Sequence, residues 1–199
     1  MVKEKWNKQF SEHQFTYGKT VNEFIKEKVH LFSPQSKLAC FAEGEGRNAV
    51  YLAKLGHAVT AYDLSPVGLK HAKVLANEND VTISTVEADL TKNQTDKEKY
   101  DGAIMVFGHV AQQDQEKFIK NIIHAVKPGG HIIIEVYSKK QLHYNTGGPG
   151  KEAFLYDPQE MLEWIKPYSC IHFFYGEVDR KEGYRHTGIG HVIQVAIEK

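Results

Sequence analysis

Two glycines and one acid form the first pattern in this sequence that could do chemistry. The segment Gly44 to Ala49 has the spacing G-x-G-x-x-A, in which glycines let the backbone approach a nucleotide at the N-terminus of a helix. It lies between the apolar run 37–42 and a helical run of apolar residues, so strand, turn and helix follow in the required order. Asp63 ends the next predicted strand, about 20 residues on, where its carboxylate can bind both ribose hydroxyls. The alternative is a structural turn with a capping acid.

A second acid narrows the kind of nucleotide. Asp89, in the segment Val86-Glu-Ala-Asp-Leu, follows the third predicted strand, where a carboxylate could accept a hydrogen bond from an adenine amino group. The chain after the fifth strand is expected to form a hairpin instead of the second βαβαβ half that a dinucleotide fold requires. A single-nucleotide cofactor is therefore favoured over a nicotinamide dinucleotide.

The elements that position these acids alternate along the chain. Strands are predicted at residues 37–42, 57–62, 81–86, 101–107 and 131–136, with helices that begin at the capping box Thr20 to Glu23, after the glycine turn, and at Ser65, Asp114 and Asp157. The pattern predicts an α/β fold: a doubly wound, Rossmann-like sheet, mostly parallel, with helices on both faces. Runs 170–178 and 190–197, separated by the turn-rich segment 179–183, are expected to add a C-terminal antiparallel hairpin.

Composition limits the classes of partner. The 199 residues suit a single domain over 1–199, of which 1–32 is expected to be a helical segment covering the site. Lys plus Arg and Asp plus Glu both number 25, so no net basic field favours nucleic acid, and none is expected as a partner. No signal-like start and no long apolar run occur, so we expect a cytoplasmic protein with no membrane partner, either a monomer or a homodimer. The histidines lack the spacing of metal ligands, and no metal is expected.

Taken in order, these motifs resemble those of class I S-adenosylmethionine-dependent methyltransferases over nearly the whole chain. The first motif of that class looks like Cys40 to Ala49, its ribose acid like Asp63 and its adenine acid like Asp89. Gly-x-Gly-Arg-Asn-Ala followed by Tyr-Leu-Ala is similar to the tellurite-resistance methyltransferases and their small bacterial relatives. The resemblance implies S-adenosylmethionine as cofactor and methyl transfer to a small-molecule acceptor.

The resemblance also implies a set of cofactor-binding residues, with one departure from the family pattern. The implied set is Tyr17, Glu43, Gly44, Glu45, Gly46, Arg47, Asn48, Asp63, Leu64, Ala88, Asp89, Leu90 and Phe107. Cys40 stands where the family carries an acid, and Ala42 stands where it carries its first glycine. Since that acid helps to hold the methionine end of the cofactor, the task is expected to pass to Glu43, Arg47 or Tyr17.

Methyl transfer from a sulfonium is an in-line displacement, in which the positioning of the acceptor dominates. Side chains expected near the carboxyl ends of the strands supply the candidates: Glu135, Tyr144, Asn145 and Tyr184 for acceptor binding, and His109 and His186 as bases. A base is useful only where the acceptor carries a proton. A thiolate or an oxyanion of tellurium or selenium needs none, so a chalcogen oxyanion, a thiol and a small metabolite all remain open. Each histidine could also be an ordinary loop residue.

Other readings stay open. Gly147 to Gly150 forms either a lid or a solvated connector. A nicotinamide-dependent oxidoreductase is disfavoured by the expected hairpin and by the absence of a Tyr-x-x-x-Lys pair. A non-catalytic S-adenosylmethionine-binding module is supported by the missing acid at Cys40 and the missing glycine at Ala42.

Overall fold

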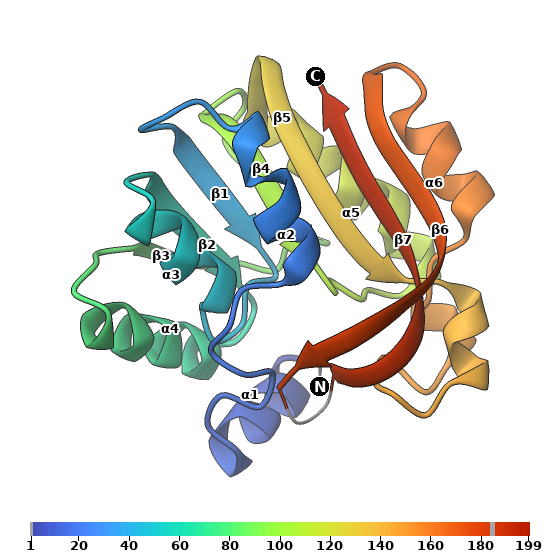
Figure 1. Cartoon of the computed structure of the whole chain (residues 1–199), viewed down its shortest axis with the longest axis horizontal. Coiled ribbons are helices and arrows are strands. Elements are labelled where there is room, and N and C mark those ends of the chain that lie inside the picture. Colours follow the sequence, from blue (N-terminus) through green and yellow to red (C-terminus); the bar gives the residue numbers. More distant parts are fainter. Residues whose placement is uncertain (1, 184–185) are drawn as a thin grey trace.

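The computed structural model describes residues 2–183 and 186–199, which build one seven-stranded sheet (Figure 1). The strands are β1 (Lys37–Phe41), β2 (Ala58–Asp63), β3 (Ser84–Glu87), β4 (Tyr100–Val106), β5 (Val126–Tyr137), β6 (Ser169–Glu182) and β7 (His186–Glu198). They lie in the order β3-β2-β1-β4-β5-β7-β6. Strands β1 to β5 pair in parallel, whereas β7 is antiparallel to both of its neighbours. The predicted doubly wound sheet with a C-terminal hairpin is confirmed.

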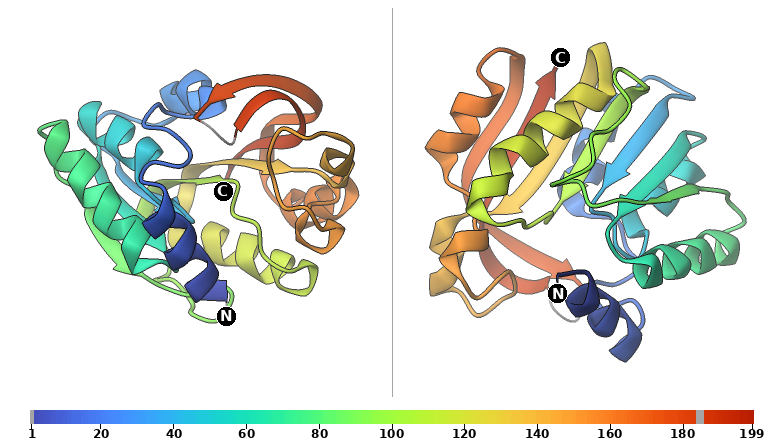
Figure 2. Two further views of the ribbon diagram at one scale, coloured as in Figure 1. Left: turned by 90° about the horizontal axis from the view of Figure 1, so that it is seen from below. Right: turned by 180° about the vertical axis from the view of Figure 1, so that it is seen from behind.

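Helices cover both faces of this sheet (Figure 2). They are α1 (Val2–Glu12), α2 (Glu23–Lys28), α3 (Arg47–Lys54), α4 (Pro66–Glu78), α5 (Gln112–Ala125) and α6 (Pro158–Ile165), with short 3-10 turns at Val29–Leu31, Lys139–His143 and Glu152–Phe154. One core contains side chains from α2, α3 and α4, and a second contains side chains from α5 and α6. Strand β1 serves both, because Leu38 and Cys40 enter one core while Ala39 and Phe41 enter the other. None of the helices in the described residues is both long and apolar enough to cross a bilayer.

The helix before β1 differs from its prediction. Its cap is Asn22, whose side chain accepts a 3.0 Å hydrogen bond from the backbone N–H of Ile25. The predicted capping box at Thr20 is therefore wrong, and α2 is only six residues long. The reason is tertiary: Asn22 is fully buried and also meets side chains of the sheet, which fixes where the helix begins.

The C-terminal hairpin is longer than predicted. Residues 179–182, expected to belong to a turn, continue β6 and pair with β7 as far as His186. Strand β5 pairs with β7 only from Val192 onward, so the paired residues 179–182 of β6 and 186–190 of β7 extend beyond the end of β5 (Figure 1). This overhang brings residues of β6 to the carboxyl ends of the parallel strands, where open α/β sheets bind ligands.

Candidate functional site

The glycine turn joins β1 to α3 and is capped by a carboxylate. Glu43 Oε1 accepts hydrogen bonds from the backbone N–H groups of Asn48 at 2.9 Å and Ala49 at 2.8 Å, both in the first turn of α3. Burial raises the pKa of the Glu43 carboxyl to about 7, although these amides and Arg47 oppose the shift. Glu43 thus supplies an acid within the motif whose usual acid position holds Cys40.

The two glycines of the turn adopt the left-handed conformation, with φ of +61° at Gly44 and +88° at Gly46. A Cβ on Gly46 would lie 2.5 Å from the Cβ and 2.8 Å from the Cα of Ala72 in α4. A Cβ on Gly44 would lie 3.1 Å from the ring of Phe10. Glycine is therefore required at position 46 by close helix packing, a different reason from the ligand approach that the motif suggested.

Asp63 ends β2 directly beside this turn. Its Oδ2 accepts from the Gly44 N–H and its Oδ1 from the Ser65 N–H, each at 2.8 Å. Burial raises the pKa of Asp63 to about 6, even though both amides favour the ionised form. Each carboxylate oxygen can accept more than one hydrogen bond, so the arrangement fits a ribose diol, whose two hydroxyls would donate to the same pair of oxygens.

The end of β3 lies next to the end of β2, where the Ala88 N–H donates to the Asp63 carbonyl at 2.9 Å. Asp89 is partly exposed, and its carboxylate accepts from the Thr91 hydroxyl at 2.6 Å and pairs with Lys92 at 2.8 Å. Burial alone would raise the pKa of Asp89, but Lys92 and Thr91 together lower it below its ordinary value. The neighbouring Leu90 side chain is buried.

The N-terminal segment is fastened to the glycine turn through Glu45. The two carboxylate oxygens accept from the backbone N–H groups of Phe15 at 2.6 Å and Thr16 at 2.8 Å, and His71 of α4 lies 2.8 Å from one of them. Glu45 was expected to contact the cofactor, yet within this structure it anchors the segment that precedes α2. Helix α1 adds a 2.6 Å hydrogen bond from the Ser65 hydroxyl to the Asn7 side chain.

Three more of the predicted cofactor residues are engaged within the protein. Arg47 forms a 2.7 Å ion pair with Glu182 of β6. The Asn48 side chain accepts a 2.9 Å hydrogen bond from the backbone N–H of Asn22. The Tyr17 hydroxyl accepts a hydrogen bond from Gln9. The guanidinium of Arg47 already meets a carboxylate, and its expected contact with the methionine end of a cofactor stays a prediction.

Aromatic rings gather beyond the ends of β4 and β5. Phe107 stacks on Tyr137 with centroids 4.5 Å apart, and His109 stacks on Tyr137 at 5.7 Å. The Nδ1–H of His109 donates to the Phe154 carbonyl at 2.8 Å, which leaves a lone pair on Nε2, a buried atom without a partner among the described residues. Burial lowers the pKa of His109 to about 4. The ring is therefore neutral at pH 7 and presents Nε2 as an acceptor.

The remaining acceptor candidates do not form one cluster. The Tyr144 hydroxyl donates to Glu177 of β6, and Asn145 is exposed. Tyr184 lies outside the described residues, and of His186 only its place at the start of β7 is described. Glu135 was expected to bind the acceptor, but it is fully buried and its carboxylate is occupied by other side chains.

The glycine-rich segment after β5 is held in place. The Gln141 amide donates to Thr146 Oγ1 at 3.2 Å and to the Gly147 carbonyl at 3.1 Å, while its Oε1 accepts from the His191 N–H at 2.7 Å. The Thr146 hydroxyl donates to the Ile189 carbonyl at 2.6 Å. Gly147 to Gly150 were expected to form either a lid or a solvated connector, and these hydrogen bonds favour a connector attached to β7.

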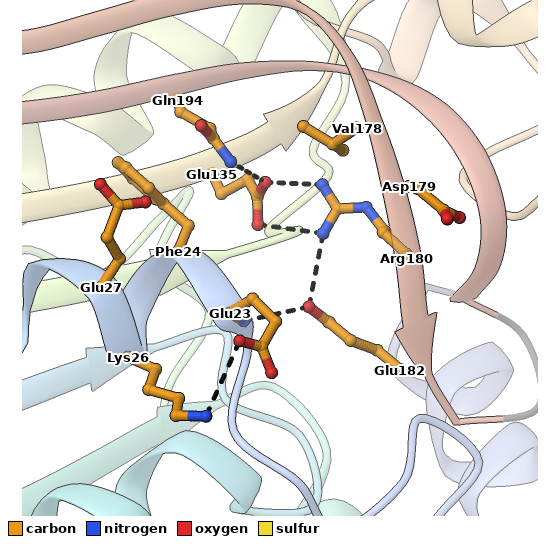
Figure 3. Close-up of a pocket in the computed structure, with 10 residues that line it drawn as sticks. All are labelled: Glu23, Phe24, Lys26, Glu27, Glu135, Val178, Asp179, Arg180, Glu182 and Gln194. Atoms are coloured by element: carbon orange, nitrogen blue, oxygen red, sulfur yellow. Dashed lines mark hydrogen bonds and ion pairs between the residues drawn. The ribbon is translucent and has the colours of Figure 1, made fainter.

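Glu135 belongs to a buried polar network that lines a cavity of about 660 Å³ between α2 and β6 (Figure 3). Its carboxylate meets Arg180 at 2.6 and 3.1 Å, Gln194 at 2.7 Å and Asn22 at 2.5 Å. The sequence pattern does not reveal Arg180 and Glu182 as site residues, because Asp179-Arg-Lys-Glu-Gly183 has the composition of a turn. Val178, Arg180 and Glu182 occupy every second position, and this alternation is typical of a strand that turns one face inward.

Known proteins resemble this chain over the region that carries the turn. A family model described as a methyltransferase domain matches residues 39–130. The ubiquinone biosynthesis O-methyltransferase of Rickettsia typhi is 32% identical over 130 residues, covering 63% of this chain and 52% of that protein. The 2-heptyl-1-hydroxyquinolin-4(1H)-one methyltransferase of Mycobacteroides abscessus is 28% identical over 109 residues, covering 53% and 48%. The chain thus spans about half the length of the curated relatives that it matches.

From residue 39 to residue 130 the chain resembles the class I S-adenosylmethionine-dependent methyltransferases. Solved structures share its fold at low identity. TehB from Haemophilus influenzae aligns with a TM-score of 0.74 and 20% identity over 98% of this chain and 67% of that one. The magnesium protoporphyrin IX methyltransferase of Synechocystis, solved with S-adenosylhomocysteine bound, aligns with a TM-score of 0.72 and 16% identity over 100% and 98%. S-adenosylmethionine is the cofactor of this family, and the surroundings of Asp63 fit its ribose.

Proposed function

We propose that this protein transfers a methyl group from S-adenosylmethionine to a small-molecule acceptor that carries an acidic hydroxyl group. The observation that carries the choice of acceptor is His109: its Nδ1–H is fixed by the Phe154 carbonyl, and its Nε2 is buried without a partner among the described residues. A lone pair placed in this way suits an acceptor that donates a proton. An anionic thiolate or chalcogen oxyanion would offer this atom no proton.

The lowered pKa of His109 further restricts the class of methyl acceptor. With a pKa of about 4, the ring is always available as a neutral base near pH 7, but it is a weak base. It therefore suits an acceptor whose own hydroxyl is acidic, as on an aromatic ring. The relatives from Rickettsia typhi and Mycobacteroides abscessus, named for O-methylation in ubiquinone biosynthesis and for methylation of 2-heptyl-1-hydroxyquinolin-4(1H)-one, support this class of acceptor.

When bound, S-adenosylmethionine supplies an activated methyl group. The residues proposed to hold it are those at the ends of three adjacent strands: Asp63 for the ribose hydroxyls, Asp89 with Ala88 and Leu90 for the adenine, and the turn from Glu43 to Gly46 with Phe107 for the remainder. His109 Nε2 would accept the proton of the acceptor hydroxyl while the methyl group passes from the sulfur of the bound cofactor to the acceptor oxygen, with S-adenosylhomocysteine as the leaving group. Because Nε2 is covered in this structure, the neighbouring loops must move to admit the acceptor.

We also propose that residues 1–32 cover the bound cofactor. Support comes from the backbone bonds of Phe15 and Thr16 to Glu45, and from Phe10, which is only 3% exposed and packs on Gly44. Helix α1 lies beyond the carboxyl ends of the strands, beside α4 (Figure 1). A small acceptor is consistent with a site enclosed in this way.

Transfer of a labelled methyl group from S-adenosylmethionine to a panel of acceptors tests the proposal. The panel contains aromatic hydroxy compounds, thiols, and tellurite or selenite. We expect labelled product from the aromatic hydroxy compounds and a loss of about 100-fold or more in His109→Gln, since positioned bases contribute roughly 10²- to 10⁴-fold. Transfer only to thiols or oxyanions, unaffected by His109→Gln, would contradict the choice of acceptor. Cofactor binding with no transfer to any acceptor would favour a binding module.

A further inference from the structure

Four buried charged side chains form a continuous series of ion pairs next to the aromatic cluster of Phe107, His109 and Tyr137. Arg47 pairs with Glu182 at 2.7 Å, Glu182 meets Arg180 at 3.5 Å, and Arg180 binds Glu135 through two nitrogens at 2.6 and 3.1 Å. None of the four residues is more than 7% exposed. Figure 3 shows Arg180 extending from β6 between the two carboxylates. Two cations and two anions balance, so no net charge is buried.

The two ends of this ion-pair chain lie at different parts of the proposed site. Arg47 is the first residue of α3, directly after the glycine turn. At the other end, the guanidinium carbon of Arg180 lies 4.6 Å from the centroid of the Phe107 ring. The Phe107 N–H donates to the Glu135 carbonyl at 2.8 Å. Phe107 is thus held by both residues of one ion pair: Glu135 accepts from its backbone N–H, and Arg180 stacks on its ring.

Phe107 needs such support because its backbone is strained. Its φ of +55° lies in the left-handed region, which is unfavourable for a bulky residue and persists only where the surroundings enforce it. Its ring is nearly parallel to that of His109, at 6° and 6.3 Å. A displacement of Phe107 would therefore shift the ring that carries the proposed base.

A gain in folding stability does not by itself explain why these ion pairs are buried. Desolvation offsets much of the attraction within a buried ion pair, so well-packed apolar residues often serve stability as well or better. A guanidinium that binds a carboxylate with two parallel N–H groups and stacks on an aromatic face instead fixes geometry in three dimensions. Lysine can supply the charge of Arg180 but neither its planar fork nor its stacking face.

We propose that Arg180 is a positioning residue: it holds Phe107, and through Phe107 the His109 ring, in register with the glycine turn to which Glu182 and Arg47 connect it. This inference deepens the proposed methyl transfer and rests on it for the effect on catalysis. The effect on Phe107 itself does not depend on any acceptor.

The first test compares Arg180→Lys with Lys181→Gln, a matched change of the exposed next residue. In Arg180→Lys we expect kcat to fall by about 10- to 100-fold, the range expected when reacting groups are misplaced by about 1 Å. The Kd for S-adenosylmethionine, measured by calorimetry, should rise by no more than about threefold, because Phe107 is only one of the residues proposed to hold the cofactor. Backbone amide exchange of residues 107–109, followed by mass spectrometry without any acceptor, should accelerate by about fivefold or more. Lys181→Gln should match wild type in all three measurements.

The second test uses Glu182→Gln, which leaves the pair between Arg180 and Glu135 in place but weakens the link to Arg47. Here we expect the reverse pattern: Kd for S-adenosylmethionine rises about five- to tenfold while kcat changes less than about threefold. Unchanged amide exchange at 107–109 in a cooperatively folded Arg180→Lys variant would overturn the positioning role. A wild-type protein that methylates no acceptor would instead refute the proposed function, and amide exchange would still decide the role of Arg180.

Discussion

Two pairs of buried carboxylates, one at the glycine turn and one behind the aromatic cluster, are satisfied in different ways. Glu43 and Asp63 accept hydrogen bonds from backbone amides at the ends of β1, β2 and the start of α3. Glu135 and Glu182 meet the guanidinium groups of arginines. Both pairs are at most 9% exposed, so burial does not distinguish them. The partners do.

This difference in partners separates a region that can respond to a ligand or to pH, at the glycine turn, from a region whose charges are held in ion pairs. Amides stabilise an anion less completely than a cation does, and the pKa values of Glu43 and Asp63 accordingly rise to about 7 and 6. These two groups can change their protonation when a ligand or the pH changes. At the other pair each negative charge is balanced by a guanidinium, and losing either partner leaves an unpaired buried charge.

The largest expected effect follows from removing one fixed carboxylate. Glu135→Ala leaves Arg180 without its main partner, and we expect the free energy of unfolding to fall by roughly 3–5 kcal/mol. Glu87→Ala is the matched control, since Glu87 is about half exposed and pairs with Lys3 on the surface. That change should cost no more than about 1 kcal/mol. Urea denaturation that gives similar losses for both variants would contradict the comparison.

The next effect concerns ligand binding at the responsive pair. Asp63→Ala removes the acceptor for the ribose hydroxyls, and we expect S-adenosylmethionine to bind more weakly by about 1.5–3 kcal/mol, or roughly 10- to 150-fold. Asp101→Ala is a suitable control, because Asp101 lies at the opposite, amino end of the sheet, where it accepts from the Lys37 N–H. Calorimetry that shows wild-type affinity for Asp63→Ala would refute the assignment of the ribose site.

Acid should reproduce part of that loss without mutation. The free protein holds Asp63 with a pKa of about 6, whereas ribose hydroxyls donate to the ionised form. Affinity for S-adenosylmethionine should therefore fall as the pH drops through 6, approaching about tenfold per pH unit below it, and Asp63→Asn should weaken this dependence. The linkage to stability has the opposite sign: a raised carboxyl pKa favours the folded state in acid, and this contribution is lost as the pH rises through 6. A flat binding profile from pH 8 to 5 would show that Asp63 does not bind the ligand as an anion.

The smallest expected effect tests the cost of the missing glycine. Ala42 has a φ of +51°, which is strained for any residue with a Cβ. Ala42→Gly relieves roughly 1–2 kcal/mol of strain but adds about 0.4–1 kcal/mol of unfolded-chain entropy, so the free energy of unfolding should rise by up to about 1 kcal/mol. Ala39→Gly, within β1, should lower it, because glycine weakens the interior of a strand. A destabilised Ala42→Gly variant would mean that the methyl group of Ala42 makes a packing contribution larger than the strain.

The sequence could predict what depends on local pattern. The turn from Glu43 to Asn48, the acid at Asp63 and the succession of strands along the chain follow from spacing and periodicity, and the structure places the turn beside Asp63. The cap at Asn22 and the tertiary partners of residues 179–182 could not be predicted in this way. Asn22 begins α2 because distant side chains bury it, and Arg180 and Glu182 lie in a strand because carboxylates and aromatic rings from other elements meet them there. The local sequence does not identify such partners, although the period-two spacing of Val178, Arg180 and Glu182 does indicate a strand.

A crystal structure with S-adenosylhomocysteine bound tests the central claim most directly. The predicted result places the ribose hydroxyls within about 3 Å of the Asp63 carboxylate and turns the sulfur toward Phe107 and His109. A small acceptor would then fit between the sulfur and Nε2. A nucleoside bound away from Asp63, or a sulfur more than about 10 Å from His109, well beyond the roughly 3–3.5 Å separation of reacting atoms plus one small acceptor, would contradict the site proposed here.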